Sequence, residues 1–260
     1  MSNLLEIKNI KKVFGEGTVN EKLALNDINL ELKGGDFVTV IGNNGAGKST
    51  LLNCIAGVYS VDEGSIVLGG KDITKLPEHK RATHIGRVFQ DPLKGTAFDM
   101  TIEQNLAIAY YKNKPRGLKI GITKKDREFF RERLQLLEMG LEDKMTQKVK
   151  LLSGGQRQAL TLFMAVIAEP KLLLLDEHTA ALDPAASAKV LELTKKFADH
   201  SDMATLMITH NMEDAHHYGN RTILMKSGQI AMQLEGEERA QMTVEKLIEK
   251  FSITSDRMLL

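Results

Sequence analysis

The chain has 260 residues and carries 35 lysines and arginines against 34 aspartates and glutamates, which leaves a formal net charge of +1. This balance gives no electrostatic reason to expect a nucleic-acid partner, and the length suffices for one large α/β domain with a substantial core. The single cysteine, Cys54, excludes an intrachain disulfide, and its apolar neighbours in the sequence predict a packed, unreactive thiol.

The amino-terminal residues alternate between apolar and charged types, without an apolar core that precedes a small-residue cleavage site. We therefore expect no secretory signal. Nowhere does an apolar run approach the roughly 18 to 20 residues that cross a bilayer. A membrane role is therefore expected to come through a partner protein.

Five segments in the first 90 residues have the pattern of β-strands. Alternation of apolar and polar residues predicts half-buried strands, and a continuous apolar run predicts a buried strand. The segments are 4–14, 23–32, 36–42, 64–73 and 84–90. A helix is expected after residue 48, because apolar residues recur at helical spacing until Gly57 ends the pattern.

The stretch from about 99 to 150 changes character. It is charged and has helical spacing, with Phe130, Leu134 and Leu137 on one face of a predicted helix. We interpret this stretch as a helical insertion into the α/β domain.

The rest of the chain returns to alternating helices and strands. Residues 172–176 and 204–210 are predicted as central parallel strands because their apolar runs are nearly continuous. Both end in polar residues, at the sheet edge where open α/β folds bind ligands. The other predicted elements are a helix over 153–168, a helix over 184–198, a hairpin over 221–236 that turns near Ser227 and Gly228, and a helix over 244–251.

The string GNNGAGKST, which starts at Gly42, has the composition of a phosphate-binding loop. Its glycines let the backbone curl so that successive N–H groups point at phosphate oxygens before a helix. Lys48 is expected to reach the β- and γ-phosphates and to assist catalysis, Ser49 to bind Mg²⁺, and Thr50 to bind phosphate. The alternative is a glycine-rich turn before an ordinary helix. The predicted ATP-binding residues here are Gly42, Asn43, Asn44, Gly45, Ala46, Gly47, Lys48, Ser49 and Thr50.

Two carboxylates follow the apolar run LLLL. Asp176 is predicted to hold Mg²⁺ through a coordinated water. Glu177 is predicted to polarise the water that attacks the γ-phosphate, as general base. The alternative, two acids that only face solvent, is disfavoured because the four leucines bury the strand that carries them.

Gln90 and His210 each follow a predicted strand. The neutral amide of Gln90 could touch the metal ion or the attacking water and act as a sensor. His210 could donate to the γ-phosphate and orient Glu177, so both residues are predicted to be catalytic and Gln90 also to bind the metal. Alone, each would be an ordinary polar strand end. The carboxylates on the sister strand favour the catalytic interpretation of His210.

The string LLSGGQ places Ser153, Gly154 and Gly155 at the start of a helix, which is a second arrangement suited to phosphate. The first loop already surrounds one triphosphate. We therefore expect these residues to meet the γ-phosphate of an ATP held by another copy, in an isologous dimer that sandwiches two nucleotides. The alternative is a serine-capped helix without a ligand.

Together, in this order, the strings resemble the nucleotide-binding subunit of ABC transporters over nearly the whole chain. The resemblance adds three ATP-binding residues: Phe14 would stack on adenine, Gln156 would belong to the signature motif, and Asp183 to the D-loop. Packing in the core is the alternative for Phe14.

Two positions depart from the family pattern. His178 follows Glu177 where the family usually has proline, and Ala180 and Ala181 stand where serine is frequent. We therefore expect fewer hydrogen bonds from the D-loop, whereas the residues predicted to bind and hydrolyse ATP match the family pattern. The strings around Gln90 and Glu177 are similar to a bacterial subgroup often associated with amino-acid uptake.

The resemblance implies an α/β fold of the P-loop NTPase class. It implies a mostly parallel core sheet with flanking helices, an antiparallel β-subdomain and a helical subdomain. In one nucleotide-binding domain over 1–260, the core with its β-subdomain would comprise 1–90 and 152–260, and the helical subdomain about 91–151. The implied function is ATP hydrolysis, with ATP and Mg²⁺ as cofactors.

The implied partners are a second copy of the chain, integral membrane permease subunits and, indirectly, an extracytoplasmic solute-binding protein, without nucleic acid. The expected location is peripheral, on the cytoplasmic face of the membrane. The permease surface is expected near Gln90 and the following apolar residues, which could equally form the core of the helical subdomain. These residues are Phe98, Met100, Ile102 and Leu106.

Two other classes of protein share part of this pattern. A soluble ABC-type ATPase that acts on nucleic acid, ribosomes or cluster assembly usually has two cassettes, coiled coils or basic extensions, none of which occurs here. A P-loop kinase for a small molecule leaves LLSGGQ and the predicted strand that ends at His210 unexplained. The transporter subunit is therefore the stronger hypothesis.

Overall fold

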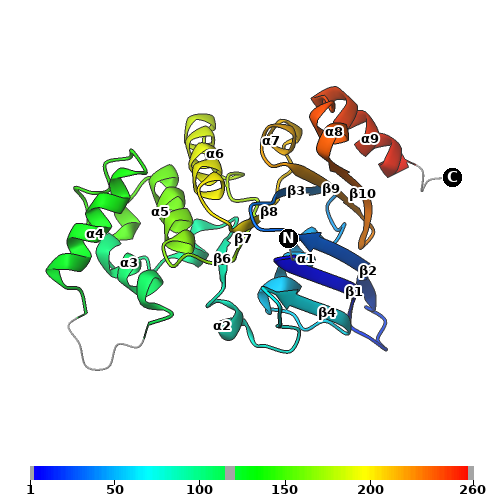
Figure 1. Ribbon diagram of the computed structural model, residues 1–260, viewed down its shortest axis with the longest axis horizontal. Helices are drawn as coiled ribbons and strands as arrows, with labels where there is room; N and C mark the ends of the chain where they lie inside the picture. The colour runs from blue at the N-terminus through cyan, green and yellow to red at the C-terminus, as the bar shows by residue number, and fades with distance from the viewer. Residues whose placement is uncertain (1–2, 115–120, 257–260) are drawn as a thin grey trace.

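The chain folds around two β-sheets that enclose one helix. The computed structural model describes residues 3–114 and 121–256 (Figure 1). Among these residues, no helix combines the length and the apolar composition that crossing a bilayer requires. The figure shows helices α3 and α4 at one end of the molecule and the four-stranded sheet with helix α9 towards the other.

The larger sheet has the strand order β10-β9-β3-β8-β7-β6, in which only β10 runs antiparallel to its neighbour. Its strands are β3 (Phe37–Gly42), β6 (Ile85–Val88), β7 (Leu172–Asp176), β8 (Ala204–Ile208), β9 (Arg221–Lys226) and β10 (Gln229–Glu235). Every residue of β3 and β8 is buried, as the predicted central strands require. The register aligns Asp176 with Ile208, so polar residues that follow β7 and β8 meet at one edge.

The smaller sheet is antiparallel, with the order β2-β1-β4-β5. Its strands are β1 (Leu5–Phe14), β2 (Lys22–Leu32), β4 (Glu63–Leu68) and β5 (Lys71–Asp72). The prediction of one strand over 64–73 is wrong. Gly69 and Gly70 both have positive φ, at 57° and 76°, and this pair turns the chain back so that β5 pairs with β4.

Nine α-helices and two short 3₁₀ helices complete the described part of the chain. They are α1 (Lys48–Ala56), α2 (Glu78–Arg81), α3 (Ile102–Tyr111), α4 (Lys124–Gln135), α5 (Gly154–Val166), α6 (Pro184–Asp199), α7 (Met212–His217), α8 (Gly236–Ala240), α9 (Val244–Asp256), η1 (Pro92–Gly95) and η2 (Val149–Leu151). The predicted helices α1, α5, α6 and α9 are confirmed within a few residues, whereas the short helices α2, α7 and α8 were not predicted.

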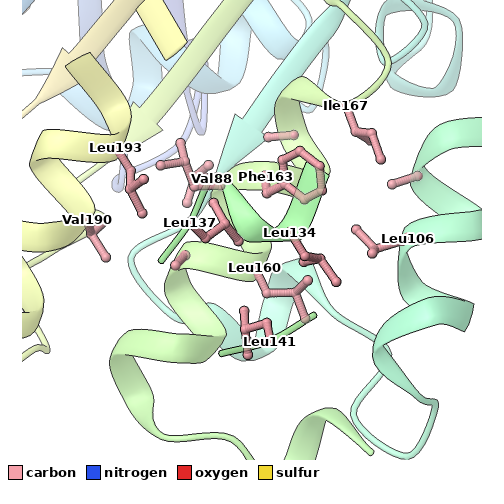
Figure 2. Close-up of a cluster of buried hydrophobic side chains, with 14 of the residues drawn as sticks. Val88, Leu106, Leu134, Leu137, Leu141, Leu160, Phe163, Ile167, Val190 and Leu193 are labelled. Atoms are coloured by element: carbon pink, nitrogen blue, oxygen red, sulfur yellow. The ribbon is translucent and has the colours of Figure 1, made fainter. Parts of the chain in front are cut away.

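The alternation of β7 divides the core into two layers. Leu172 and Leu174 belong to the apolar cluster around α1, which also contains residues of the smaller sheet. Leu173 and Leu175 belong to a second cluster, which also contains residues of α3, α4, α5 and α6 (Figure 2). Because both faces of the strand are buried, each leucine contributes about 1.5–3 kcal/mol through burial.

The second cluster shows what the apolar residues after Gln90 do. Phe130, Leu134 and Leu137 are fully buried in it, as the predicted helical face requires. Ile102 and Leu106 are also fully buried there, so of the two interpretations left open for them the subdomain core is correct. The division of the chain into a core and a helical subdomain at residues 91 and 151 stays a prediction.

Candidate nucleotide-binding site

The loop between β3 and α1 is held in a tight curve by its glycines. Gly42 has φ 156° and Gly47 has φ 101°. A Cβ atom on Gly42 would lie 2.4 Å from the carbonyl oxygen of Met225, and one on Gly47 would lie 2.7 Å from that of Ala24. Neighbouring backbone therefore excludes side chains at both positions, which explains glycine there beyond conformational freedom.

Lys48 begins α1 and is only 5% exposed. Its Nζ donates hydrogen bonds to the carbonyl oxygens of Gly42 at 2.7 Å and Asn43 at 3.1 Å. Burial lowers the pKa of this ammonium, and the nearby charges of Glu177 and Asp176 oppose that shift. The cation is thus fixed inside the loop, where a polyphosphate would face it.

A cavity of about 190 Å³ opens beside this loop. Loop residues 44–50 line it together with Phe14, Lys22 and Glu177. The predicted phosphate-binding residues, the predicted adenine-stacking ring and the predicted general base therefore share one cavity. The ring of Phe14 meets that of Tyr59 edge to face at 5.1 Å between centroids.

Ser49 and Asp176 form the pair of oxygen ligands expected for Mg²⁺. The Ser49 hydroxyl donates to Asp176 Oδ1 at 3.2 Å, and burial, as the largest cause, raises the pKa of the Asp176 carboxyl. The described residues contain no group of three or more His, Cys, Asp or Glu residues that could hold a metal ion alone. One hydroxyl and one carboxylate fit a magnesium ion that takes its other ligands from phosphate oxygens and water.

Glu177 and His210 meet across the ends of neighbouring strands. His210 Nε2 lies 2.5 Å from Glu177 Oε1, and the side chain of His210 is 46% exposed whereas that of Glu177 is only 13% exposed. Glu177 has φ 48°, a conformation that L residues adopt at a cost of about 1–3 kcal/mol. Its amide donates to the Ile208 carbonyl at 3.1 Å, which helps to hold the turn.

Gln90 lies in a second, wider depression of about 700 Å³. Asp176 and Ala181 also line this groove, so Gln90 shares it with the predicted metal ligand and the D-loop. Its predicted roles at the metal ion and the attacking water stay predictions.

The predicted signature residues, Ser153–Gln156, lie outside the phosphate-loop cavity. Ser153 caps α5 in a reciprocal capping box: its Oγ accepts from the Gln156 amide at 3.2 Å, and Gln156 Oε1 accepts from the Ser153 amide at 3.3 Å. Ser153 and Gly154 are exposed, whereas Gly155 is buried against Ala186. None of Ser153–Gln156 lines the cavity at the phosphate loop.

Asp183 has a structural partner in the described fold. Its Oδ1 accepts from the Ala186 amide at 3.0 Å, so it caps α6, and Pro184 occupies the first turn. A role in ATP binding stays a prediction, because Asp183 does not line the phosphate-loop cavity.

Sequence reasoning missed three residues at this site. Lys22 and Ala24 line the cavity, and the register that pairs Lys22 with Phe14 becomes visible only in the structure. His178 was singled out only as a departure from a family pattern, whereas in the structure it is fully enclosed beside Glu177.

The strand-loop-helix unit with a magnesium-type hydroxyl and carboxylate pair defines the chain as a P-loop nucleotide-binding protein. Residues 25–180 match the family model described as ABC transporter. The "Tyrosine transport ATP-binding protein" of Clostridioides difficile (strain R20291) is 42% identical over 248 residues, which cover 95% of this chain and 98% of that protein. A "Methionine import ATP-binding protein" of Clostridium tetani (strain Massachusetts / E88) is 33% identical over 255 residues, covering 95% of this chain and 75% of that protein.

Solved structures give the same assignment. The ADP conformation of MJ1267, an ATP-binding cassette of an ABC transporter, has a TM-score of 0.79 at 27% identity and covers 97% of this chain and 99% of its own. The dimeric post-hydrolysis state of the cassette MJ0796, bound to ADP and Pi, has a TM-score of 0.75 at 29% identity. This match covers 89% of this chain and 98% of the MJ0796 chain. The chain belongs to the ABC transporter family, has the fold of its ATP-binding cassettes and is an ATPase.

Proposed function

We propose that two copies of this chain sandwich two Mg-ATP and drive import of a small, amino-acid-like solute through membrane permease subunits. One observation carries the dimer. Ser153 and Gly154 are exposed at the start of α5, outside the cavity that the phosphate loop, Phe14 and Glu177 line. A second copy could bring its own Ser153 and Gly154 to that cavity, because none of the residues that line it within one copy comes from α5.

In this proposal, separate groups of residues bind the phosphates, accept the proton from water and hold the metal ion. The loop amides and Lys48 hold the β- and γ-phosphates, and the capped start of α5 from the other copy faces the γ-phosphate. Glu177 accepts a proton from the attacking water while His210 holds its carboxylate in place. Mg²⁺, held by Ser49 and Asp176 with Gln90 nearby, would supply charge neutralisation at the phosphates.

The permease would dock on the groove beside Gln90. Val58, Tyr59 and Phe89 give this groove apolar walls, and Asp176, which also lines it, links it to the nucleotide site. A helix seated there would displace Gln90 when the copies close or separate, and so couple the permease to the nucleotide. The chain would then lie on the cytoplasmic face of the membrane.

The proposed cargo class rests on relatives. Two proteins that this chain resembles over 95% of its length are described as serving tyrosine transport and methionine import. An amino-acid-like solute, delivered to the permease by an extracytoplasmic binding protein, is the cargo class consistent with both.

A mixing experiment tests the sandwich. Lys48→Ala disables the phosphate loop and Ser153→Arg blocks the signature, so each variant alone should be inactive. In a mixed dimer, the intact loop of one copy meets the intact signature of the other and restores one site. An equimolar mixture should therefore recover about a quarter of wild-type hydrolysis, because half of the random dimers carry one good site of two.

Two outcomes would contradict the proposal. If Ser153→Arg alone hydrolyses ATP at the wild-type rate, the signature does not complete the site. If the mixture stays inactive although both variants form mixed dimers by pull-down of a tagged copy, the two half-sites do not combine.

A further inference from the structure

His178 is the one fully enclosed polar side chain in the segment between β7 and α6. Among residues 177–183, all of which the structure describes, it alone is buried, at 2% exposure. It directly follows Glu177, whose backbone is in the left-handed region. The segment therefore has one interior anchor, and that anchor is bonded to the residue proposed as general base.

The hydrogen bonds of Thr194 determine how the imidazole is held. Thr194 lies in α6, and its hydroxyl donates to the Val190 carbonyl at 2.8 Å. His178 Nε2 lies 3.1 Å from the same hydroxyl oxygen. Because the hydroxyl has only one proton, which is directed at Val190, its oxygen accepts here and Nε2 must carry a proton and donate.

This hydrogen bond connects the catalytic turn to the body of the molecule. Thr194 is fully buried in the middle of α6, a helix that packs along α5. At the other side of the turn, the Glu177 amide donates a hydrogen bond to the Ile208 carbonyl of β8. The Ala180 amide donates one to the Glu177 carbonyl at 3.1 Å. The turn is thus fastened to β8 at Glu177 and to α6 at His178.

We propose that His178 is a positioning residue for ATP hydrolysis: through its hydrogen bond to Thr194 it fixes the turn that aims the Glu177 carboxylate at the attacking water. The inference rests on the proposed role of Glu177. Packing alone would need only an apolar side chain of similar volume. A buried imidazole with a directed donor adds an orientation, and an orientation of the neighbouring backbone is what a general base in a strained turn requires.

The central test is His178→Leu, which keeps an apolar volume and removes the donor. We expect kcat for ATP hydrolysis to fall about ten- to a hundredfold, because a misplacement of about 1 Å costs up to about a hundredfold. The Kd for ATP should stay unchanged, since the phosphate loop is not touched. His178→Gln should restore most of the turnover, because its amide Nε2–H can reach the same acceptor.

Thr194→Val tests the other end of the hydrogen bond, and the chain offers a matched control. Thr161 in α5 is also buried and also donates to a carbonyl one turn back, that of Arg157 at 2.9 Å, but no histidine contacts its hydroxyl in the described structure. Thr194→Val should lower kcat as His178→Leu does, and Thr161→Val should not. The double variant His178→Leu/Thr194→Val should lose no more turnover than either single variant.

Melting temperatures and ATP affinity separate a folding defect from the proposed one. A His178→Leu protein that melts as the wild type does, binds ATP and retains kcat within twofold would overturn the inference. So would equal kcat losses in Thr194→Val and Thr161→Val. Neither result would affect the proposed function, which is tested separately by the mixing experiment with Lys48→Ala and Ser153→Arg; the role of Glu177 is tested separately by Glu177→Gln.

Discussion

Lys48 and Ser153 each stand at the start of a helix that can face phosphate, yet the two helices begin differently. Helix α1 is preceded by Gly47, which offers no side-chain cap, so its first amide groups are left for a ligand. Helix α5 starts with a complete capping box between Ser153 and Gln156. The first helix start leaves its amides free for an anion, whereas the second is already capped and exposed, as the proposed contact with a nucleotide on another copy requires.

The burial of the two regions follows the same division. Lys48 is buried and interacts electrostatically with the carboxylates of Glu177 and Asp176. Leu151, two residues before Ser153, is 64% exposed. Removing a group from the first region should therefore abolish binding or chemistry in one copy. Removing a group from the second should affect only the reaction that needs two copies.

The largest effect is expected from Lys48→Ala. It removes the only cation that the structure places inside the phosphate loop, among the residues described, so ATP affinity and turnover should both fall, turnover by at least about a hundredfold. Isothermal titration with Mg-ATP and a phosphate-release assay would measure this. Lys22→Ala is the control, because Lys22 lines the same cavity but is exposed. Equal losses in both variants would contradict a special role for Lys48.

Glu177→Gln should separate binding from chemistry. The amide keeps the shape of the carboxylate but cannot accept a proton from water, so turnover should fall about 10²- to 10⁴-fold. ATP binding should persist, and ATP should shift the variant to a dimer in size-exclusion chromatography because the sandwich cannot reset. Undiminished hydrolysis would remove Glu177 from the role of base. A variant that stays monomeric with saturating ATP would count against the sandwich.

The motifs predicted more of the first region than of the second. The strands β3, β7 and β8 are buried on both faces, so their apolar runs identify them without any partner information. The polar residues that follow them then fall together by topology alone, which is why Glu177 and His210 could be paired from the sequence.

What the sequence did not reveal depends on contacts between distant segments. The four to six residues of α2, α7 and α8 are too few to display a helical period. His178 finds its hydrogen-bond partner in Thr194, sixteen residues later on another element. Ser153 lies outside the phosphate-loop cavity because of where the fold places the start of α5. Ile102 and Leu106 had the composition of either a core or a contact surface, and only packing distinguished them.

A smaller effect should separate the structural role of Ser153 from its proposed functional one. Ser153→Ala removes the capping oxygen and should cost about 1 kcal/mol of stability. Thr123→Ala is the matched control, because Thr123 forms the same kind of capping box at the start of α4. Both variants should melt slightly earlier by thermal denaturation, but only Ser153→Ala should lose turnover. Equal turnover in the two variants would show that Ser153 serves the helix alone.

The smallest expected effect concerns Cys54, which lies in α1 behind the phosphate loop. Burial raises the pKa of its thiol to about 11, so almost no thiolate exists at pH 8 and a maleimide should not label the folded protein. Leu151→Cys places a second thiol on the exposed surface before Ser153 and should be labelled readily. In a Glu177→Gln background, ATP should slow that labelling if a second copy covers this surface. Fast labelling of Cys54 in the native protein would show that the region behind the phosphate loop opens, and the contrast between the two regions would then be one of dynamics as well as burial.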